Sequence, residues 1–193
     1  MRIIKQALKL FLVLTVITGV VYPLLITAVG NIVFPRQSNG SLMKIDSKIV
    51  GSALIGQKFT ENKYFWPRPS AVDYNPLPSG GSNQGMTSEL LNAAIRERKK
   101  LLIESNPGAG EPPADLLLAS GSGLDPHISP EAAIYQIERI ARARQLDNKQ
   151  KKSLTNIVQN HIEQFQLGIL GRPRVNVLIL NIALDSAFAD IAL

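Results

Sequence analysis

The stretch LFLVLTVITGVVYPLLITAVGNIVFP, residues 10–35, decides the fold, because 26 consecutive residues carry no charge. The nine residues before it include Arg2, Lys5 and Lys9 and no acid, and all fifteen carboxylates of the chain lie behind it. A helix rises about 1.5 Å per residue, so about 20 to 25 apolar residues cross a bilayer core of roughly 30 Å. The sequence therefore predicts a transmembrane helix over residues 10–34.

The charges beside this segment predict its orientation. Basic residues that flank a membrane span stay on the cytoplasmic side. We therefore expect residues 1–9 in the cytoplasm, a periplasmic (extracytoplasmic) domain over residues 36–184 and a C-terminal tail over residues 185–193. The chain is predicted to cross the inner (plasma) membrane once, with membrane lipid around the span.

A cleaved signal peptide is the competing interpretation of the N-terminus. Signal peptides share the basic start, but their apolar region usually runs about 7 to 15 residues and ends at a small-x-small site. Ala28-Val29-Gly30 fits such a site, yet the apolar run continues to Phe34. Its length favours a retained membrane anchor.

The 158 residues behind the span are enough for one domain with a hydrophobic core. Their composition excludes several classes of function. The net charge is +6, and three of the 21 basic residues precede the span, which leaves eighteen basic and fifteen acidic residues behind it. This small excess does not indicate a nucleic-acid-binding face. Cysteine is absent, which excludes disulfides, thiolate metal sites and cysteine nucleophiles.

Periodicity and turn residues predict a mixed α/β (α+β) domain. Helices are expected to begin near Thr87, to begin at Pro130 behind a Ser129 cap, and to span residues 148–166. Strands are expected over residues 52–59, 114–119 and 174–184, with a loop over residues 73–85.

The densest motif is the glycine-rich segment SGSGLDPHISP, residues 120–130. It joins a predicted strand to a capped helix, where loop amides and a helix N-terminus attract anions. Ser120, Gly121, Ser122 and Gly123 are therefore candidate anion contacts, although the segment matches neither a Walker loop nor a dinucleotide fingerprint. The alternative is a structural turn, in which the glycines take positive φ and Ser129 caps the helix.

Other candidate sites are weaker. Asp125, His127 and Glu131 could ligate a metal, but His161 is the only other histidine, and packed or partly exposed histidines are the favoured interpretation. Ser82 lies in Gly80-Gly81-Ser82-Asn83-Gln84, which lacks the last glycine of an esterase elbow.

The aromatic run Tyr64-Phe65-Trp66 could stack on a sugar or a partner, but a core or loop-anchoring role is favoured. A membrane-tethered ligand-binding domain or enzyme built around Ser122, Asp125 and His127 remains an alternative function.

Several blocks occur together in a distinctive order. They are GSALIGQ (51–57), YFWPRPSA (64–71), SGGSN (79–83), the segment from Ala114 to Ala133 that contains ASGSGLDPHISPEAA, then Gln136, Arg139, Ala143-Arg144, and RVNVLILN (174–181). In this order they resemble the KdpC family, the C subunits of the bacterial high-affinity potassium-transporting P-type ATPase. Met86, where proline is expected, and the tail from Asp185 depart from the family pattern.

The resemblance implies a non-catalytic accessory subunit that acts with a channel-like subunit KdpA, an ATPase subunit KdpB and a small peptide KdpF. It also implies a catalytic chaperone that raises the ATP affinity of the ATPase subunit and is needed for assembly. The expected nucleotide or anion contacts are Ser120, Gly121, Ser122, Gly123 and Gln136, with ATP as the shared cofactor and no metal. The predicted periplasmic location conflicts with direct ATP binding, and it favours a role in assembly or gating near the channel entrance.

Overall fold

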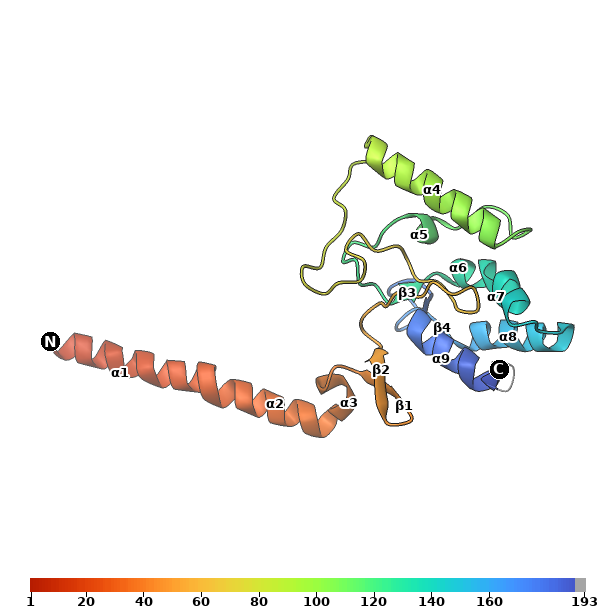
Figure 1. Ribbon diagram of the computed structural model, residues 1–193. Coiled ribbons are helices and arrows are strands. Elements are labelled where there is room, and N and C mark those ends of the chain that lie inside the picture. Colours follow the sequence, from red (N-terminus) through yellow and green to blue (C-terminus); the bar gives the residue numbers. More distant parts are fainter. Residues whose placement is uncertain (190–193) are drawn as a thin grey trace. The chain divides into compact units, whose positions relative to one another are not determined.

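The computed structural model describes residues 1–189 and divides into two compact units, Met1–Ser52 and a second unit that begins at Ala53 (Figure 1). The first unit contains the long apolar helix, and the second contains the hydrophobic core. Residues 190–193 of the predicted tail lie outside the described residues.

The first unit contains one long apolar helix, as the sequence predicts. It comprises α1 (Arg2–Val16), the π-helical turn η1 (Ile17–Val21) and α2 (Tyr22–Val33). The continuous helix of 32 residues is long and apolar enough to cross a membrane, and none of its most apolar window is buried in the protein. The described residues therefore do not cover these apolar side chains, which must be shielded from water by something else.

Pro23 explains the π-helical turn. Proline has no N–H group, so the preceding carbonyls cannot all keep their usual helical partners. The chain widens instead, and the Tyr22 N–H bonds to the Ile17 carbonyl, five residues back. The hydroxyls of Thr18 and Thr27 donate to the carbonyls of Leu14 and Pro23, each at 2.8 Å, so these polar groups are satisfied within the helix.

After the apolar helix, the first unit ends in a short helix and a hairpin. Helix α3 spans Pro35–Ser38, and strands β1 (Leu42–Ile45) and β2 (Lys48–Ser52) pair antiparallel. Asp46 and Ser47, which join the strands, both have positive φ, as a tight two-residue turn requires.

The second unit is an α/β domain with a three-stranded antiparallel sheet in the order β3-β5-β4. Its elements in chain order are α4 (Glu89–Ser105), α5 (Ala114–Leu117), β3 (His127–Ile128), α6 (Pro130–Tyr135), α7 (Ile137–Ala143), α8 (Asn148–Asn160), β4 (Ile162–Glu163), β5 (Arg174–Asn176) and α9 (Val177–Ala187). This agrees with the predicted fold class. Ile128 and Ile162 both pair with Val175, so β5 is the central strand.

Helices α6 to α9 bury their apolar faces with this small sheet. Leu154 and Val158 of α8 and Leu180 and Leu184 of α9 are fully inaccessible to solvent, as is Val175 of the central strand. Phe65, from an irregular segment distant in sequence, completes the same core. The segment that contains Phe65 is therefore fixed by tertiary packing.

The three strand predictions are wrong in detail. Residues 53–59 contain no strand, and residues 114–117 form helix α5. Only Arg174–Asn176 is extended in the third region, because the Asn176 side chain accepts a hydrogen bond from Ile179 N–H and starts α9. Packing of the apolar face of α9 outweighs the β propensity of its valine and isoleucine residues.

The helix predictions are closer to the structure. Helix α4 begins behind a Ser88 cap, and α6 begins at Pro130 behind the Ser129 cap, as predicted. Helix α8 begins at Asn148 with an Asp147 capping box but ends at Asn160, short of the predicted residue 166. Residues from Ile162 onward form β4 and the connection to β5.

Candidate functional site

Buried polar side chains hold the irregular segment Asn62–Trp66 by its backbone. Asn181 of α9 accepts from the Phe65 N–H at 2.8 Å and donates to the Phe65 carbonyl at 3.0 Å. Gln136, at the junction of α6 and α7, makes the same pair of bonds with Trp66, at 2.7 and 3.1 Å. Two side-chain amides thus replace the neighbouring strand that this segment lacks.

Two arginines extend this arrangement. Arg139 donates to the Asn62 carbonyl at 2.7 Å, and Arg144 donates to the Lys63 carbonyl at 2.9 Å. The Arg139 guanidinium also lies 4.0 Å from the centre of the Trp66 ring. Burial lowers the pKa of Arg139 to about 10, because it disfavours the charged guanidinium.

The aromatic run is therefore part of the core and its border. Phe65 is fully buried, which confirms the core interpretation for this residue. Tyr64 donates a hydrogen bond to Asp185 in α9, and Arg144 pairs with the same carboxylate. Burial, together with the bond to Asp185, raises the pKa of Tyr64.

The five residues that are predicted to contact nucleotide differ in their exposure to solvent. Ser120 and Gly123 are buried, whereas Gly121 and Ser122 are exposed. Gln136 is fully buried, its Oε1 accepts from Trp66 and Arg139, and it shares no hydrogen bond with the loop in residues 1–189. The structure brings the four loop residues together and places Gln136 in the core.

The glycine-rich loop packs tightly against other backbone segments. Gly123 has φ +71°, and a Cβ placed there would lie 2.6 Å from Val72 Cγ2 and 2.8 Å from the Gly80 carbonyl. Gly121 has no atom within 4 Å of its Cβ position and no positive φ. The predicted turn role therefore belongs to Gly123 and does not extend to Gly121. The predicted Ser129 cap is present, since Ser129 Oγ accepts from Ala132 N–H at 3.0 Å.

These contacts predict unequal effects for two alanine substitutions. Gly123→Ala forces a side chain into a left-handed conformation and against backbone, so it should destabilise the domain by more than about 1 kcal/mol. Gly121→Ala enters open space and should change stability by less than about 0.5 kcal/mol. Thermal unfolding of the two variants measures the difference, and equal melting temperatures would contradict this account of the loop.

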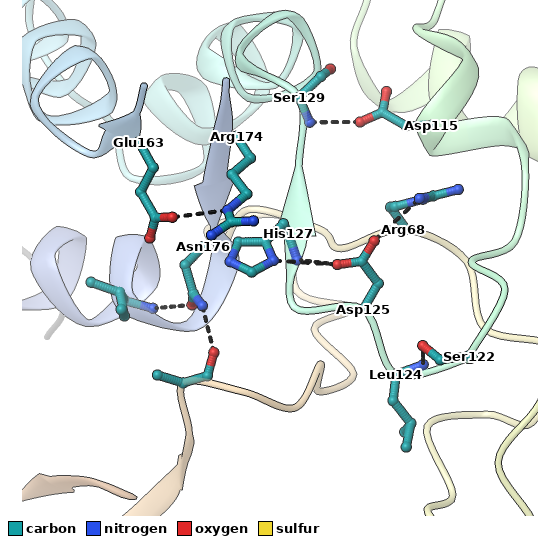
Figure 2. Close-up of polar contacts among 12 residues, drawn as sticks. Arg68, Asp115, Ser122, Leu124, Asp125, His127, Ser129, Glu163, Arg174 and Asn176 are labelled. Atoms are coloured by element: carbon teal, nitrogen blue, oxygen red, sulfur yellow. Dashed lines mark hydrogen bonds and ion pairs between the residues drawn. The ribbon is translucent and has the colours of Figure 1, made fainter. Parts of the chain in front are cut away.

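Asp125 and His127 form the polar group that follows the loop (Figure 2). Asp125 accepts from the His127 backbone N–H at 3.0 Å, its Oδ1 lies 3.4 Å from His127 Nδ1, and its Oδ2 lies 3.2 Å from Arg68. Burial alone would raise the pKa of Asp125, but the bonds from His127 and the charge of Arg68 outweigh it and lower the pKa. Asp125 is thus an anion that orients Arg68 and His127.

Arg68 and His127 belong to a cavity of about 320 Å³, which we call the arginine pocket. Its lining consists of Arg68, Asp115, Asp125, His127, Ile128, Ser129, Arg172, Pro173 and Arg174. Both carboxylates are engaged, since Asp115 accepts from the Ser129 N–H at 2.7 Å. Figure 2 shows Arg174 paired with Glu163 on the neighbouring strand, at 2.9 Å.

The metal alternative requires Asp125, His127 and a third ligand to converge. In the described residues, 1–189, no group of three histidine, aspartate or glutamate side chains could hold a metal ion. The Ser122 hydroxyl accepts from the Leu124 N–H at 3.1 Å, so it belongs to a local turn.

The arginine pocket is not predicted by the sequence motifs described above. Each of its three arginines adjoins a proline, in Pro67-Arg68-Pro69 and in Arg172-Pro173-Arg174, and prolines restrict the backbone that carries them. This pairing of arginine with proline is the only feature of these segments that indicates rigidly held arginines. It could not show that residues about one hundred positions apart line one cavity.

The fold defines a class of protein, with one long apolar N-terminal helix followed by a small α/β domain. Within this class, the family described as "KdpC: K+-transporting ATPase, c chain" matches residues 4–186. The chain belongs to the KdpC family.

Curated relatives named "Potassium-transporting ATPase KdpC subunit" match over nearly the full length of both proteins. The relative from Methylococcus capsulatus is 53% identical over 186 residues, which cover 94% of this chain and 96% of the relative. The relative from Leptospira interrogans is 48% identical over 191 residues, with 99% and 97% covered. That from Dechloromonas aromatica is 50% identical over 188 residues, with 95% and 97% covered.

Proposed function

We propose that this chain is a membrane-anchored accessory subunit of an ATP-driven, high-affinity potassium uptake complex. The family match over residues 4–186 carries the proposal, because it includes both the apolar helix and the α/β domain. The curated relatives are named as subunits of a potassium-transporting ATPase. The proposed partners are the channel-like subunit KdpA, the ATPase subunit KdpB and the peptide KdpF.

A non-catalytic role is part of this proposal. It is supported by the structural hydrogen bonds and ion pairs that three polar residues of the second unit make. Asp125 is held by Arg68 and His127, Ser129 caps a helix, and Gln136 binds backbone. These groups stabilise a fold, and none of them is a nucleophile placed beside a base.

The effect on ATP is a finer part of the proposal. The chain would act as a catalytic chaperone, raising the ATP affinity of the ATPase subunit and supporting assembly. Direct nucleotide contact at Ser120–Gly123 and Gln136 stays a prediction. It is supported by the exposure of Gly121 and Ser122 and opposed by the full use of the Gln136 amide. Photolabelling with an ATP analogue tests it: loss of labelling in Gly121→Val at unchanged melting temperature supports contact, and labelling equal to wild type removes it.

The proposed location is the inner membrane, with the second unit outside the cytoplasm. The three basic residues before the span support this orientation. Protease added to spheroplasts should degrade the α/β domain and leave an N-terminal fragment in the membrane. Digestion only after lysis would place the domain in the cytoplasm and favour direct contact with nucleotide.

Growth at low potassium tests the function itself. A strain that lacks this chain, and has no other potassium uptake system, should grow normally in high potassium and poorly when potassium is scarce. Restoring the full chain should restore growth. Equal growth of both strains at low potassium would contradict the proposed function.

A further inference from the structure

The connection between β4 and β5 carries a large apolar tip that is exposed in the described part of the chain. Phe165, Leu167, Ile169 and Leu170 are 45%, 89%, 80% and 54% exposed. Two backbone bonds between Gln166 and Leu170, at 2.8 and 2.9 Å, close the turn, so the tip is an ordered structure. Several large apolar side chains exposed together on one ordered loop are typical of a contact site.

The arginine pocket begins two residues after this tip, at Arg172. Each guanidinium has five N–H donors. Within residues 1–189, the Arg68 guanidinium bonds only to Asp125, the Arg174 guanidinium bonds only to Glu163, and the Arg172 side chain has no hydrogen bond or ion pair. The buried Arg68 Nε has no hydrogen-bond partner in the same residues. The cavity therefore holds more donors than acceptors, which suits a ligand with several anionic oxygens.

We propose that the β4–β5 hairpin binds the outer surface of the bilayer: the tip enters the lipid interface, and the arginine pocket holds the phosphate of an anionic phospholipid. Apolar side chains gain free energy on leaving water, and arginines near an anionic surface add electrostatic attraction. The hairpin thus carries an apolar tip and contributes Arg172 and Arg174 to the adjoining arginine pocket, and this combination matches both parts of a phospholipid.

Anchorage makes this binding effective even at low intrinsic affinity. The inference rests on the membrane anchorage proposed above. The second unit begins at Ala53, twenty residues after the apolar helix ends at Val33, so the domain stays within reach of lipid. Such a tether gives a high effective concentration.

A lipid surface fits the tip better than an apolar protein surface does. A purely apolar protein partner would cover the tip but would leave the donors of Arg68 and Arg172 without acceptors. Glu163, the carboxylate on the β4–β5 ladder, is already paired with Arg174. Anionic headgroups supply the missing oxygens directly outside the apolar layer that the tip would enter.

The test uses the absence of cysteine from the natural chain. Full-length Leu167→Cys, Val20→Cys and Met86→Cys variants are each labelled with a polarity-sensitive fluorophore and reconstituted in nanodiscs that contain quencher-labelled phospholipid. Met86 is the exposed control, at 92%, in a loop of the same unit. Quenching of the label at position 20 shows that the apolar helix lies in the bilayer, and quenching at position 167 shows that the tip contacts lipid. Failure of the proposed anchorage and failure of the proposed lipid contact therefore give different results.

We expect quenching of the labels at positions 167 and 20 but little at position 86, with stronger quenching at position 167 in phosphatidylglycerol than in phosphatidylcholine. Arg172→Gln should reduce lipid affinity about five-fold, whereas Arg142→Gln, on the exposed face of α7, should have little effect.

Three results would overturn parts of the inference. Quenching at position 20 with none at position 167 would remove the lipid contact and leave the anchor intact. Quenching at position 167 that is insensitive to Arg172→Gln would overturn the phosphate site. Shielding of the label at position 167 from both lipid and water on assembly with the other subunits would assign the tip to a protein partner instead.

Discussion

Replacing Arg139 with methionine should destabilise the α/β domain by about 2 to 4 kcal/mol. The substitution leaves the buried Asn106 Oδ1 without its donor, which costs about 1 to 3 kcal/mol, and it also removes the bonds to the Asn62 carbonyl and to the buried Gln136 Oε1. It also removes the contact with the Trp66 ring. Burial of the charged guanidinium is unfavourable and lowers the pKa of Arg139 to about 10. Removing this buried charge therefore offsets part of the loss of stability.

The melting temperature should fall by roughly 5 to 15 °C for a domain of this size. Thermal unfolding can be followed by the fluorescence of Trp66, the single tryptophan of the chain. Arg142→Met is the matched control, because Arg142 lies on the exposed face of the same helix. Equal melting temperatures for the two variants would show that the Asn62–Trp66 segment does not depend on Arg139.

Deleting residues 2–35, with an unrelated cleavable signal peptide added for export, should abolish function in potassium-limited growth. The domain should become soluble, because the only apolar helix of the described chain that is long enough to cross a membrane is removed. A tether raises the effective concentration of a binding partner, and its loss typically weakens binding by about 10²- to 10⁴-fold.

The control for the deletion is the same domain on an unrelated membrane-spanning helix of equal length. This variant should return to the membrane fraction, and its growth separates a simple tether from specific helix contacts. Full growth at low potassium without any anchor would contradict the proposed role of residues 10–34.

Features encoded by neighbouring residues could be predicted from the sequence. The apolar helix follows from 26 uncharged residues, and the start of α6 follows from Ser129 and Pro130. Both depend on local solvation and local hydrogen bonds, which sequence spacing reveals directly. The glycine-rich turn was also predictable in kind, although only the structure distinguishes Gly123 from Gly121.

Features that depend on distant contacts could not be predicted. The Val177–Ala187 segment has strand-like composition, yet packing of Leu180 and Leu184 makes it a helix. Gln136 is polar, and its sequence context does not show that its amide binds the backbone of Trp66, seventy residues away. The arginine pocket likewise joins Arg68 to Arg172 and Arg174 through the tertiary fold.

Capture of this chain from potassium-starved membranes tests the central claim most directly. A C-terminal tag on the full-length chain should recover, in mild detergent, material that hydrolyses ATP faster when potassium is added. The same purification from cells that express only the anchor-deleted chain should recover no such activity. Recovery of the full-length chain without potassium-stimulated ATP hydrolysis, from cells whose membranes contain that activity, would contradict its assignment as a subunit of the complex.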